Sequence, residues 1–527
     1  MSFRNISTNQ IVVWAALLLG LVASLALGST VGASDVKTVS VAFALLLVAM
    51  LLIWLKVNIW ILIPIGWYLN GRLGFLPLPL TVRDLLLSLS IGAFVLFFAL
   101  RAIPRARKRT AVDYLMYINL AYLVSVYVRN PAGLYAFGSD VVGGKPYFEV
   151  VLAFCVYLVL SRVTPSATVA KNFPLFSLIP LTTVSLLDAV SRTLPALAPT
   201  ISYVYSGVVS SLSALGSIVE GNVARIPSFQ FVAQVGGLAA CSYYRPISLI
   251  NPMFLPRIVG FALIILAIFV SGHRIALLDF VAFFVLGTLL RNTFRDLWII
   301  GAVATFSVLA AIGLQGTMLQ LPIAAQRVLT MIPADWDSEA VVDADSTTTW
   351  RLDMWKWAWE DNRILRDKVW GQGFGVNADD LNILSSKLQS GTGSEGAFVG
   401  ASRQEWFLLY GGFHNGPIST VRCVGGVGFV LFVPLMFYLA FTAWKLARRA
   451  VNTRACGLVL FTAIPLIYEP FKFLSVFGGF ETALANTIFG AGLLNMASNY
   501  LSSVETPPDS IVGQSAQDPR DPVILGA

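Results

Sequence analysis

The residues best suited to chemistry lie at the end of the longest polar stretch of the chain, 315–426. Near that end, residues 413–417 read Phe-His-Asn-Gly-Pro, just ahead of an apolar run. Histidine exchanges a proton near neutral pH, so His414 is a candidate general base where a loop re-enters the membrane. The alternative is an interfacial histidine that donates a hydrogen bond at a helix start. Asn415 either orients the ring or caps that helix, and Pro417 suits its first turn.

Three arginines supply positive charge, two of them near the ends of apolar runs and one within the polar stretch. Arg274 lies between two such runs, where its guanidinium either snorkels to water or binds an anion such as phosphate. Its neighbour His273 either shares this role or is a local interface residue. Arg351 lies in a Trp-rich segment that predicts an aromatic helix at the depth of lipid headgroups. Arg225 precedes a weakly apolar run, where a single arginine often has no special role.

Acidic residues at the start of the polar stretch form two pairs of the type Asp-x-Asp. The pairs are Asp335 with Asp337 and Asp343 with Asp345. Such pairs bind metals only with further ligands at suitable spacing, which the sequence lacks. A solvated linker over 335–345 is therefore expected, with no metal site and no cofactor.

Three glycines occur at every second position, at Gly371, Gly373 and Gly375. They neither follow a strand nor match a phosphate-binding loop. We expect them to let the polar stretch fold back on itself, because glycine adopts backbone conformations that other residues avoid.

The composition indicates that these residues are positioned by a membrane-embedded helical scaffold. Of 527 residues, 57% are hydrophobic and 12% are charged, whereas soluble domains carry about 25% charged residues. The apolar runs are continuous and about twenty residues long, which predicts helices rather than a barrel. The fold class expected is an all-α polytopic membrane protein.

Fourteen apolar runs are candidate spans. They are 11–28, 38–56, 57–70, 83–103, 111–129, 147–163, 173–190, 228–243, 258–272, 275–291, 296–314, 420–442, 457–474 and 481–500. The third is short and either spans or re-enters, so twelve to fourteen transmembrane helices are expected. The first has no clear cleavage site and is expected to be a retained helix.

Basic residues predict the orientation of the chain. The net charge of +8 reflects clusters in short loops beside the runs, at 101–109 and 445–454, so it indicates topology rather than nucleic-acid binding. If 228–243 spans, both termini are cytoplasmic and the long loop is extracytoplasmic. If it does not, the loop is cytoplasmic.

The same reading divides the chain into four parts. They are an N-terminal transmembrane bundle at 1–314, an extracytoplasmic loop domain at 315–419, C-terminal transmembrane helices at 420–500 and a disordered cytoplasmic tail at 501–527.

Taken together, these features resemble the O-antigen ligase and polysaccharide polymerase superfamily of bacterial membrane glycosyltransferases. The resemblance covers roughly residues 225–440. Its elements, in order, are Ser271-x-x-Arg274, Arg351 and Trp355 ahead of Gly371-x-Gly373, and His414-Asn415 followed by Gly425 or Gly426. The chain departs from the family where His273 replaces a usual serine and where the polar loop is longer than is common.

The resemblance implies a metal-independent glycosyltransferase of type C-like fold in the bacterial plasma (inner) membrane. It would move a glycan from an undecaprenyl-diphosphate carrier to a hydroxyl of a glycan or lipid acceptor on the outer face. Arg225, Arg274 and Arg351 would hold the diphosphate, and His414 would take the hydroxyl proton, which typically contributes about 10²–10⁴-fold. Asn415 and His273 would support them. Polymerase and ligase share this chemistry, and polysaccharide assembly proteins are expected partners.

Two other functions stay open from the sequence. A secondary transporter or flippase would need intramembrane charges paired between helices, and Asp188 and Asp279 are the nearest candidates. A structural component of an assembly complex would instead use the long loop as its binding surface.

Overall fold

The structure is a computed structural model, and all regular structure in its described residues is helical. It describes residues 46, 48–74, 80–100, 109–131, 144–207, 226–315, 320–362, 364–375 and 411–505. Within these ranges the only β-type pairing is an isolated bridge between Arg72 and Thr81. The expected all-α class is confirmed for this part of the chain.

Helices follow the apolar runs of the sequence in order. They are η2 (Lys56–Ile61), α3 (Leu62–Gly66), α4 (Val82–Ala99), α5 (Ala111–Arg129), α6 (Lys145–Leu160), α7 (Ala167–Thr193), η3 (Pro195–Leu197), α8 (Ala198–Val204), α10 (Phe229–Tyr243), η4 (Pro246–Leu249), η5 (Pro252–Phe254), α11 (Leu255–Ser271), α12 (Arg274–Leu290), α13 (Phe294–Leu314), α14 (Ile323–Leu329), α15 (Ser338–Glu360), α18 (Gly416–Ala450), α19 (Cys456–Phe471), η6 (Lys472–Val476) and α20 (Phe480–Glu505). Of the fourteen predicted spans, 11–28 lies outside the described residues, as does the predicted tail beyond Glu505.

Six helical segments in the described part are long and apolar enough to cross a membrane. They are Val82–Ala99, Ala111–Arg129, Ala167–Thr193, Pro252–Ser271, Gly416–Ala450 and Cys456–Val476. A seventh candidate is the pair Val48–Leu55 and Asn58–Gly66, which is bent by 114° as a broken span or a re-entrant loop. The described part of the chain therefore has the helices of a polytopic membrane protein, with six that could span a membrane.

Several expected spans form helices too short to qualify by length. α6, α10 and α12 have 16, 15 and 17 residues. At about 1.5 Å per residue they reach about 22–26 Å, less than the hydrocarbon thickness of about 30 Å.

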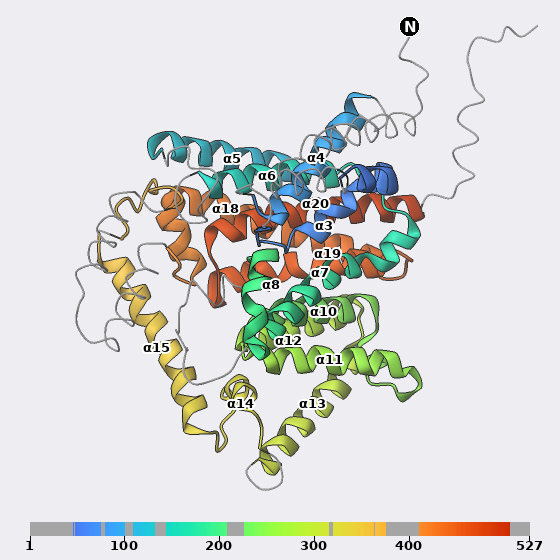
Figure 1. Ribbon diagram of the computed structural model, residues 1–527, viewed down its shortest axis with the longest axis vertical. Helices are drawn as coiled ribbons and strands as arrows, with labels where there is room; N and C mark the ends of the chain where they lie inside the picture. The colour runs from blue at the N-terminus through green and yellow to red at the C-terminus, as the bar shows by residue number, and fades with distance from the viewer. Residues whose placement is uncertain are drawn as a thin grey trace, which may run out of the picture.

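The helices pack in layers around the C-terminal part of the chain. α4, α5 and α6 lie above α18, α19, α20 and α7, and α10, α12 and α11 lie below them (Figure 1). Small residues let the central helices approach closely, which is how membrane helices associate. An example is Gly492 of α20, where an added Cβ would lie 3.1 Å from Tyr157 Cα of α6.

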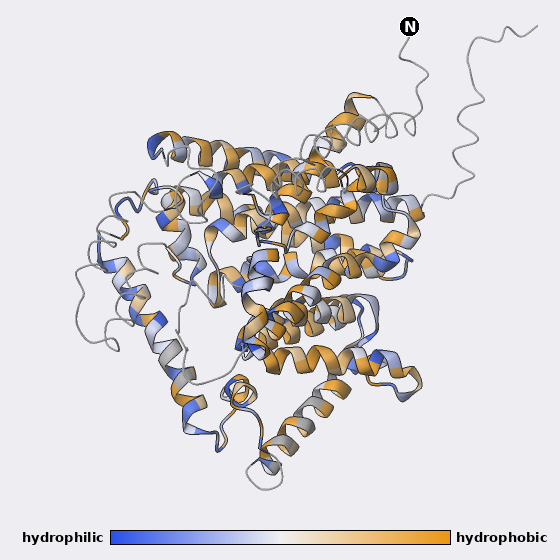
Figure 2. Cartoon of the chain, viewed as in Figure 1, coloured by the Kyte–Doolittle hydropathy of each residue, from blue (hydrophilic) through white to orange (hydrophobic). Residues whose placement is uncertain are grey.

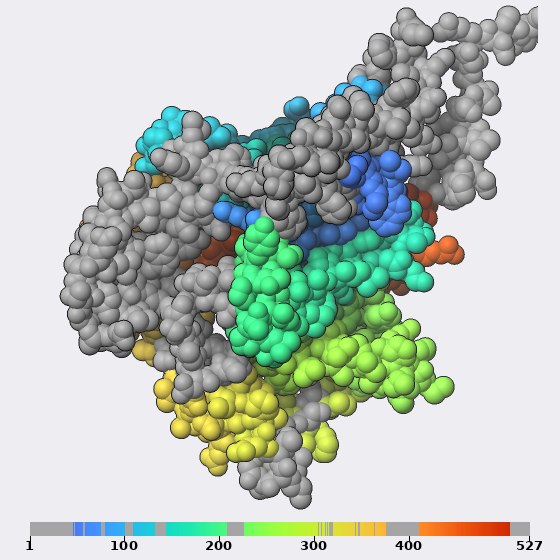
Figure 3. Space-filling model, viewed as in Figure 1, coloured from blue at the N-terminus to red at the C-terminus, as the bar shows by residue number. Residues whose placement is uncertain are grey.

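α15 lies along the side of this bundle and is the most polar of its long helices (Figure 2). Its N-terminal end lies beside α14, and the yellow residues of both helices lie against the green lower helices in the space-filling view (Figure 3). α15 also contacts α18. It therefore joins the lower helices to the start of α18.

The predicted acidic linker at 335–345 is wrong in its C-terminal part. α15 begins at Ser338, and Asp337 caps it by accepting a hydrogen bond from Glu339 N at 2.9 Å. Carboxylates favour the N-terminal end of a helix, because its backbone N–H groups are unpaired there and its dipole is positive. Acidic composition therefore indicated a helix start rather than a solvated linker.

Candidate functional site

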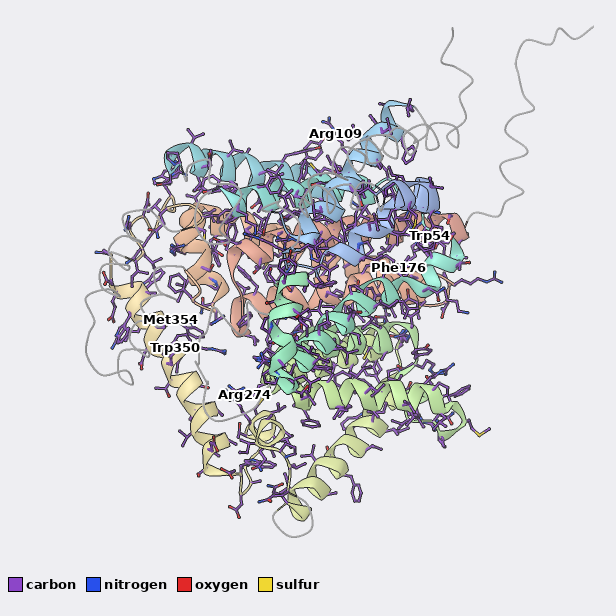
Figure 4. The ribbon with its side chains drawn as sticks, in the orientation of Figure 1. Trp54, Arg109, Phe176, Arg274, Trp350 and Met354 are labelled. Atoms are coloured by element: carbon purple, nitrogen blue, oxygen red, sulfur yellow. The ribbon has the colours of Figure 1, made fainter. Side chains whose placement is uncertain are left out.

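Arg274 is the first residue of α12, and its side chain contacts the start of α15. Its Nη2 donates to the Ala344 carbonyl oxygen at 3.0 Å and to Thr348 Oγ1 at 3.2 Å. Arg274 lies beside the lower half of α15, with Trp350 and Met354 farther along that helix (Figure 4). The guanidinium is thus fixed by protein contacts across seventy residues of sequence rather than only reaching for water.

One face of α15 connects this arginine to the region of His414. Ala344, Thr348, Arg351 and Trp355 are spaced four, three and four residues apart, which aligns them along the helix. Trp355 Nε1 donates to the Phe413 carbonyl oxygen at 2.7 Å. Because a helix rises about 1.5 Å per residue, Thr348 and Trp355 are about 10 Å apart along the axis. Arg351 lies between the two contacts.

Apolar side chains hold α15 against the start of α18. Met354, Ala358 and Phe413 are fully buried, with Trp355 and Ile418 packed around them. This packing fixes the distance between the face that carries Arg351 and the residue that follows Phe413.

His414 has a backbone conformation that is uncommon for residues other than glycine. Its φ is 51°, in the left-handed region, which costs roughly 1–2 kcal/mol for a residue with a Cβ. Its ring stacks on Phe477, with centroids 4.9 Å apart and planes inclined by 24°. Backbone strain of this kind occurs at functional sites when the surroundings enforce it.

Asn415 is the N-cap of α18, which is one of the two roles expected for it. Its Oδ1 accepts a hydrogen bond from Ile418 N at 3.0 Å. Pro417 lies in the first turn, as predicted. The cap ends the left-handed turn at His414 and starts the helix at a defined residue.

His273 lies at the N-cap position of α12, and its backbone N–H donates to Ser271 Oγ at 3.3 Å. The buried Ser271 hydroxyl in turn donates to the Ile268 carbonyl oxygen at 2.7 Å. The Ser-x-x-Arg pattern therefore forms a tight turn between α11 and α12. This turn directs Arg274 towards α15.

Arg327 of α14 is a further cation at this turn, and the sequence reading missed it. It is buried, and its Nη1 donates to the Gly272 carbonyl oxygen at 2.6 Å. The available signal was a single arginine within the otherwise uncharged segment Ile323–Leu329. Arg327 thus binds the same turn that carries Arg274.

Arg225, the third predicted arginine, lies outside the described residues. The described chain resumes at Ile226, whose N–H donates to the Val270 carbonyl oxygen at 3.3 Å.

The glycine-rich turn packs against α18, a contact that the sequence did not predict. Gly371, Gly373 and Gly375 have φ of 79°, 86° and 84°. Gly371 lies against Gly425, where α18 is interrupted by φ 69° and ψ −179°. An added Cβ on Gly371 would lie 2.5 Å from Gly425 N, and one on Gly425 would lie 2.2 Å from the Val369 carbonyl oxygen. The turn and the interruption each require glycine.

The interruption exposes backbone groups that the turn then satisfies. Gln372 N and Gly373 N donate to the carbonyl oxygens of Arg422 and Cys423, both at 2.9 Å. Gly426 N donates to the Lys368 carbonyl oxygen at 2.8 Å. The polar segment is thereby bonded to the start of α18, a few residues after His414.

Arg422 is a second buried arginine that the sequence reading missed. Its Nη2 donates to the Gly375 carbonyl oxygen at 3.2 Å, and it interacts electrostatically with Glu481 of α20. An arginine within an apolar run was the signal, because intramembrane charges are costly. Its contacts indicate that it fastens the glycine turn.

Both aspartates of the transporter alternative are paired in the structure. Asp279 Oδ2 lies 2.9 Å from Lys472 Nζ, an ion pair between α12 and η6. Asp188 Oδ1 lies 2.9 Å from Arg192 Nε within α7. Only the first pair joins two separate helical segments.

Arg351 lies on α15, between the residues of α15 that contact Arg274 and the tryptophan that is bonded to Phe413, next to His414. Arg327 binds the turn that precedes Arg274. Cations at one end suit a bound anion, and an imidazole at the other suits proton transfer. Among the described residues no group of three or more His, Cys, Asp and Glu side chains is arranged to hold a metal ion. No protein-family model and no curated protein matches this chain.

Proposed function

We propose that this protein is a membrane glycosyltransferase of the polysaccharide polymerase or O-antigen ligase type. It would transfer a glycan from an undecaprenyl-diphosphate-linked saccharide to a hydroxyl of a glycan or lipid acceptor. One observation carries the proposal: a single face of α15 joins the contact of Arg274, the position of Arg351 and the hydrogen bond to Phe413 beside His414.

The proposed reaction assigns a separate task to each end of this face. The bond between the anomeric carbon and the diphosphate oxygen breaks, and the lipid diphosphate leaves with the electron pair. Arg274 and Arg351, with Arg225 as a further candidate, stabilise the charge that develops there. His414 accepts the proton as the acceptor oxygen forms the new glycosidic bond. Attack opposite the leaving group inverts the anomeric centre.

The proposal includes a multi-pass protein of twelve to fourteen spans with a type C-like fold in a bacterial inner membrane. The loop domain at 315–419 and the active site would face outward, and both termini inward. This orientation requires α10 (Phe229–Tyr243) to cross the membrane, although its 15 residues are fewer than a full span needs. It packs against α7, α11, α12 and α19. Polysaccharide assembly proteins are the proposed partners.

The test is glycan chain length on a gel, in a deletion strain complemented with the parent protein or with His414→Ala. Single repeat units that accumulate on the lipid carrier would identify a polymerase, and long carrier-linked chains that are never attached would identify a ligase. Arg449→Ala, at the exposed pair with Glu505, is the control and is expected to give parental product. Parental product from His414→Ala, with equal protein in the membrane, would contradict the proposal.

A transporter or flippase is the second candidate, and the Asp279–Lys472 pair favours it. This pair joins two helical segments within the bundle, as transport residues often do. Loss of substrate uptake in Asp279→Asn, with His414→Ala unaffected, would replace the glycosyltransferase proposal with this one.

A further inference from the structure

The segment after α19 lies directly against the backbone around His414. It comprises residues 472–478, which begin with the π-helical turn η6. A Cβ added to Gly416 would lie 2.3 Å from the Phe473 carbonyl oxygen, and one added to Gly478 would lie 3.1 Å from Gly416 Cα. Both glycines thus permit a backbone approach that a side chain would prevent.

Phe477 connects this segment to the imidazole. Its ring stacks on His414 at 4.9 Å between centroids. Its backbone N–H donates to the Lys472 carbonyl oxygen at 2.9 Å, which closes η6. Because stacked aromatic rings prefer defined geometries, the orientation of the His414 ring depends on the conformation of this turn.

The side chain of Lys472 holds the other end of the same turn. Its Nζ lies 2.9 Å from Asp279 Oδ2 on α12, and Asp279 is 0% exposed. Gln234 of α10 donates to the same oxygen. The Tyr468 side chain also interacts with Asp279, and Glu469 interacts electrostatically with Lys472. Four helical elements, α10, α12, α19 and η6, therefore meet at this ion pair, whose aspartate is buried.

We propose that Asp279 and Lys472 are positioning residues for His414. The ion pair fixes Lys472, the Lys472 carbonyl fixes Phe477, and Phe477 covers one face of the imidazole. That this ring acts as a base rests on the proposed function, whereas the mechanical link from the ion pair to the ring does not. π-helical turns recur at functional sites, and this one has a ring contact at one end and a buried charge at the other.

The experiment measures how fast His414 is acylated by diethyl pyrocarbonate in the purified full chain in detergent. Site-resolved mass spectrometry separates it from His273, the other histidine of the chain. The double variant Asp279→Asn/Lys472→Met removes both charges and leaves neither one buried alone. We expect the rate at His414 to rise by about three- to tenfold as Phe477 leaves the ring. A rate equal to or below that of the parent overturns the inference.

Two comparisons make the result specific. Phe477→Leu is expected to raise the rate equally, with no further rise when it is combined with the double variant. Asp188→Asn/Arg192→Met, at the pair within α7, is expected to give the parental rate. If this control rises as much, general loosening explains the effect and the inference fails.

A variant that fails to fold does not end the test. If the double variant does not fold, Asp279→Asn is used alone, because Gln234 and Glu469 remain as neighbours that reduce the effect of losing the aspartate charge. An acylation rate at His414 equal to or below that of the parent again overturns the inference. Glycan chain length is then measured on the same variants. Faster acylation together with parental glycan in His414→Ala would refute the proposed function and keep the positioning link. Unchanged acylation would refute the link alone.

Discussion

At the scale of the residue, the most informative feature is the conformation of His414. Its φ of 51° is held between the Trp355 hydrogen bond to Phe413 on one side and the Asn415 cap on the other. Histidine tolerates this region better than most residues with a Cβ. The surrounding contacts therefore keep a titratable ring at a strained position.

The strain predicts how substitutions at this position affect stability. His414→Gly is expected to be more stable than His414→Ala by about 1 kcal/mol, because glycine adopts a left-handed conformation without a Cβ clash. Thermal unfolding of the two purified variants measures the difference, and both are expected to lose glycan transfer. An alanine variant as stable as the glycine variant would show that the left-handed turn is not maintained.

Arg351 provides a second prediction at this scale. Arg351→Ala is expected to lower glycan transfer by about 10²–10³-fold, the loss typical of one group that stabilises developing charge. Transfer of a labelled lipid-linked saccharide in membranes measures it. Lys356→Ala, on the exposed side of the same helix, is the matched control and is expected to change little. Equal effects of both substitutions would mean that only the charge of α15 matters.

At the scale of the element, the contact between the glycine turn and α18 determines where the polar segment is attached. A side chain on Gly371 or on Gly425 would need the space that the backbone of the other glycine already fills. The interruption at Gly425 separates the first turns of α18, which carry the capped start and Arg422, from the long apolar part.

This contact yields a prediction with a control next to it in sequence. Gly425→Ala is expected to destabilise the protein by about 2 kcal/mol or more, because it combines a left-handed φ with a backbone clash. Gly426→Ala is expected to be close to neutral, since its added Cβ would lie 3.6 Å from the Lys368 carbonyl oxygen. Thermal unfolding in detergent measures both. A comparable loss from the two substitutions would contradict the packing.

At the scale of the whole molecule, α15 lies on one side of the bundle, next to the start of α18 (Figure 1). The proposed topology puts that side outside the cell. Ser338→Cys, in exposed residues at the start of α15, is then expected to react with a membrane-impermeant maleimide in intact cells. Arg454→Cys, in the predicted cytoplasmic loop, is expected to react only after permeabilisation. The reverse pattern would place the candidate site in the cytoplasm.

The sequence alone determined the features that depend on local patterns. Apolar runs predicted the order of the helices, the asparagine and proline after His414 predicted the start of α18, and three alternate glycines predicted a turn. These follow from the composition and spacing of a few neighbouring residues, because membrane burial and helix capping are local requirements. The acidic segment misled because helix starts and solvated linkers both favour carboxylates.

Only the tertiary structure decided which distant residues meet. Arg274 contacts Thr348, Gly371 contacts Gly425, and Lys472 pairs with Asp279 across 193 residues of sequence. No local pattern specifies these partners, because each depends on how separate helices pack and on which face each presents. For the same reason Arg327 was missed: a single arginine in a short segment gains significance only once the carbonyl group that it binds is known.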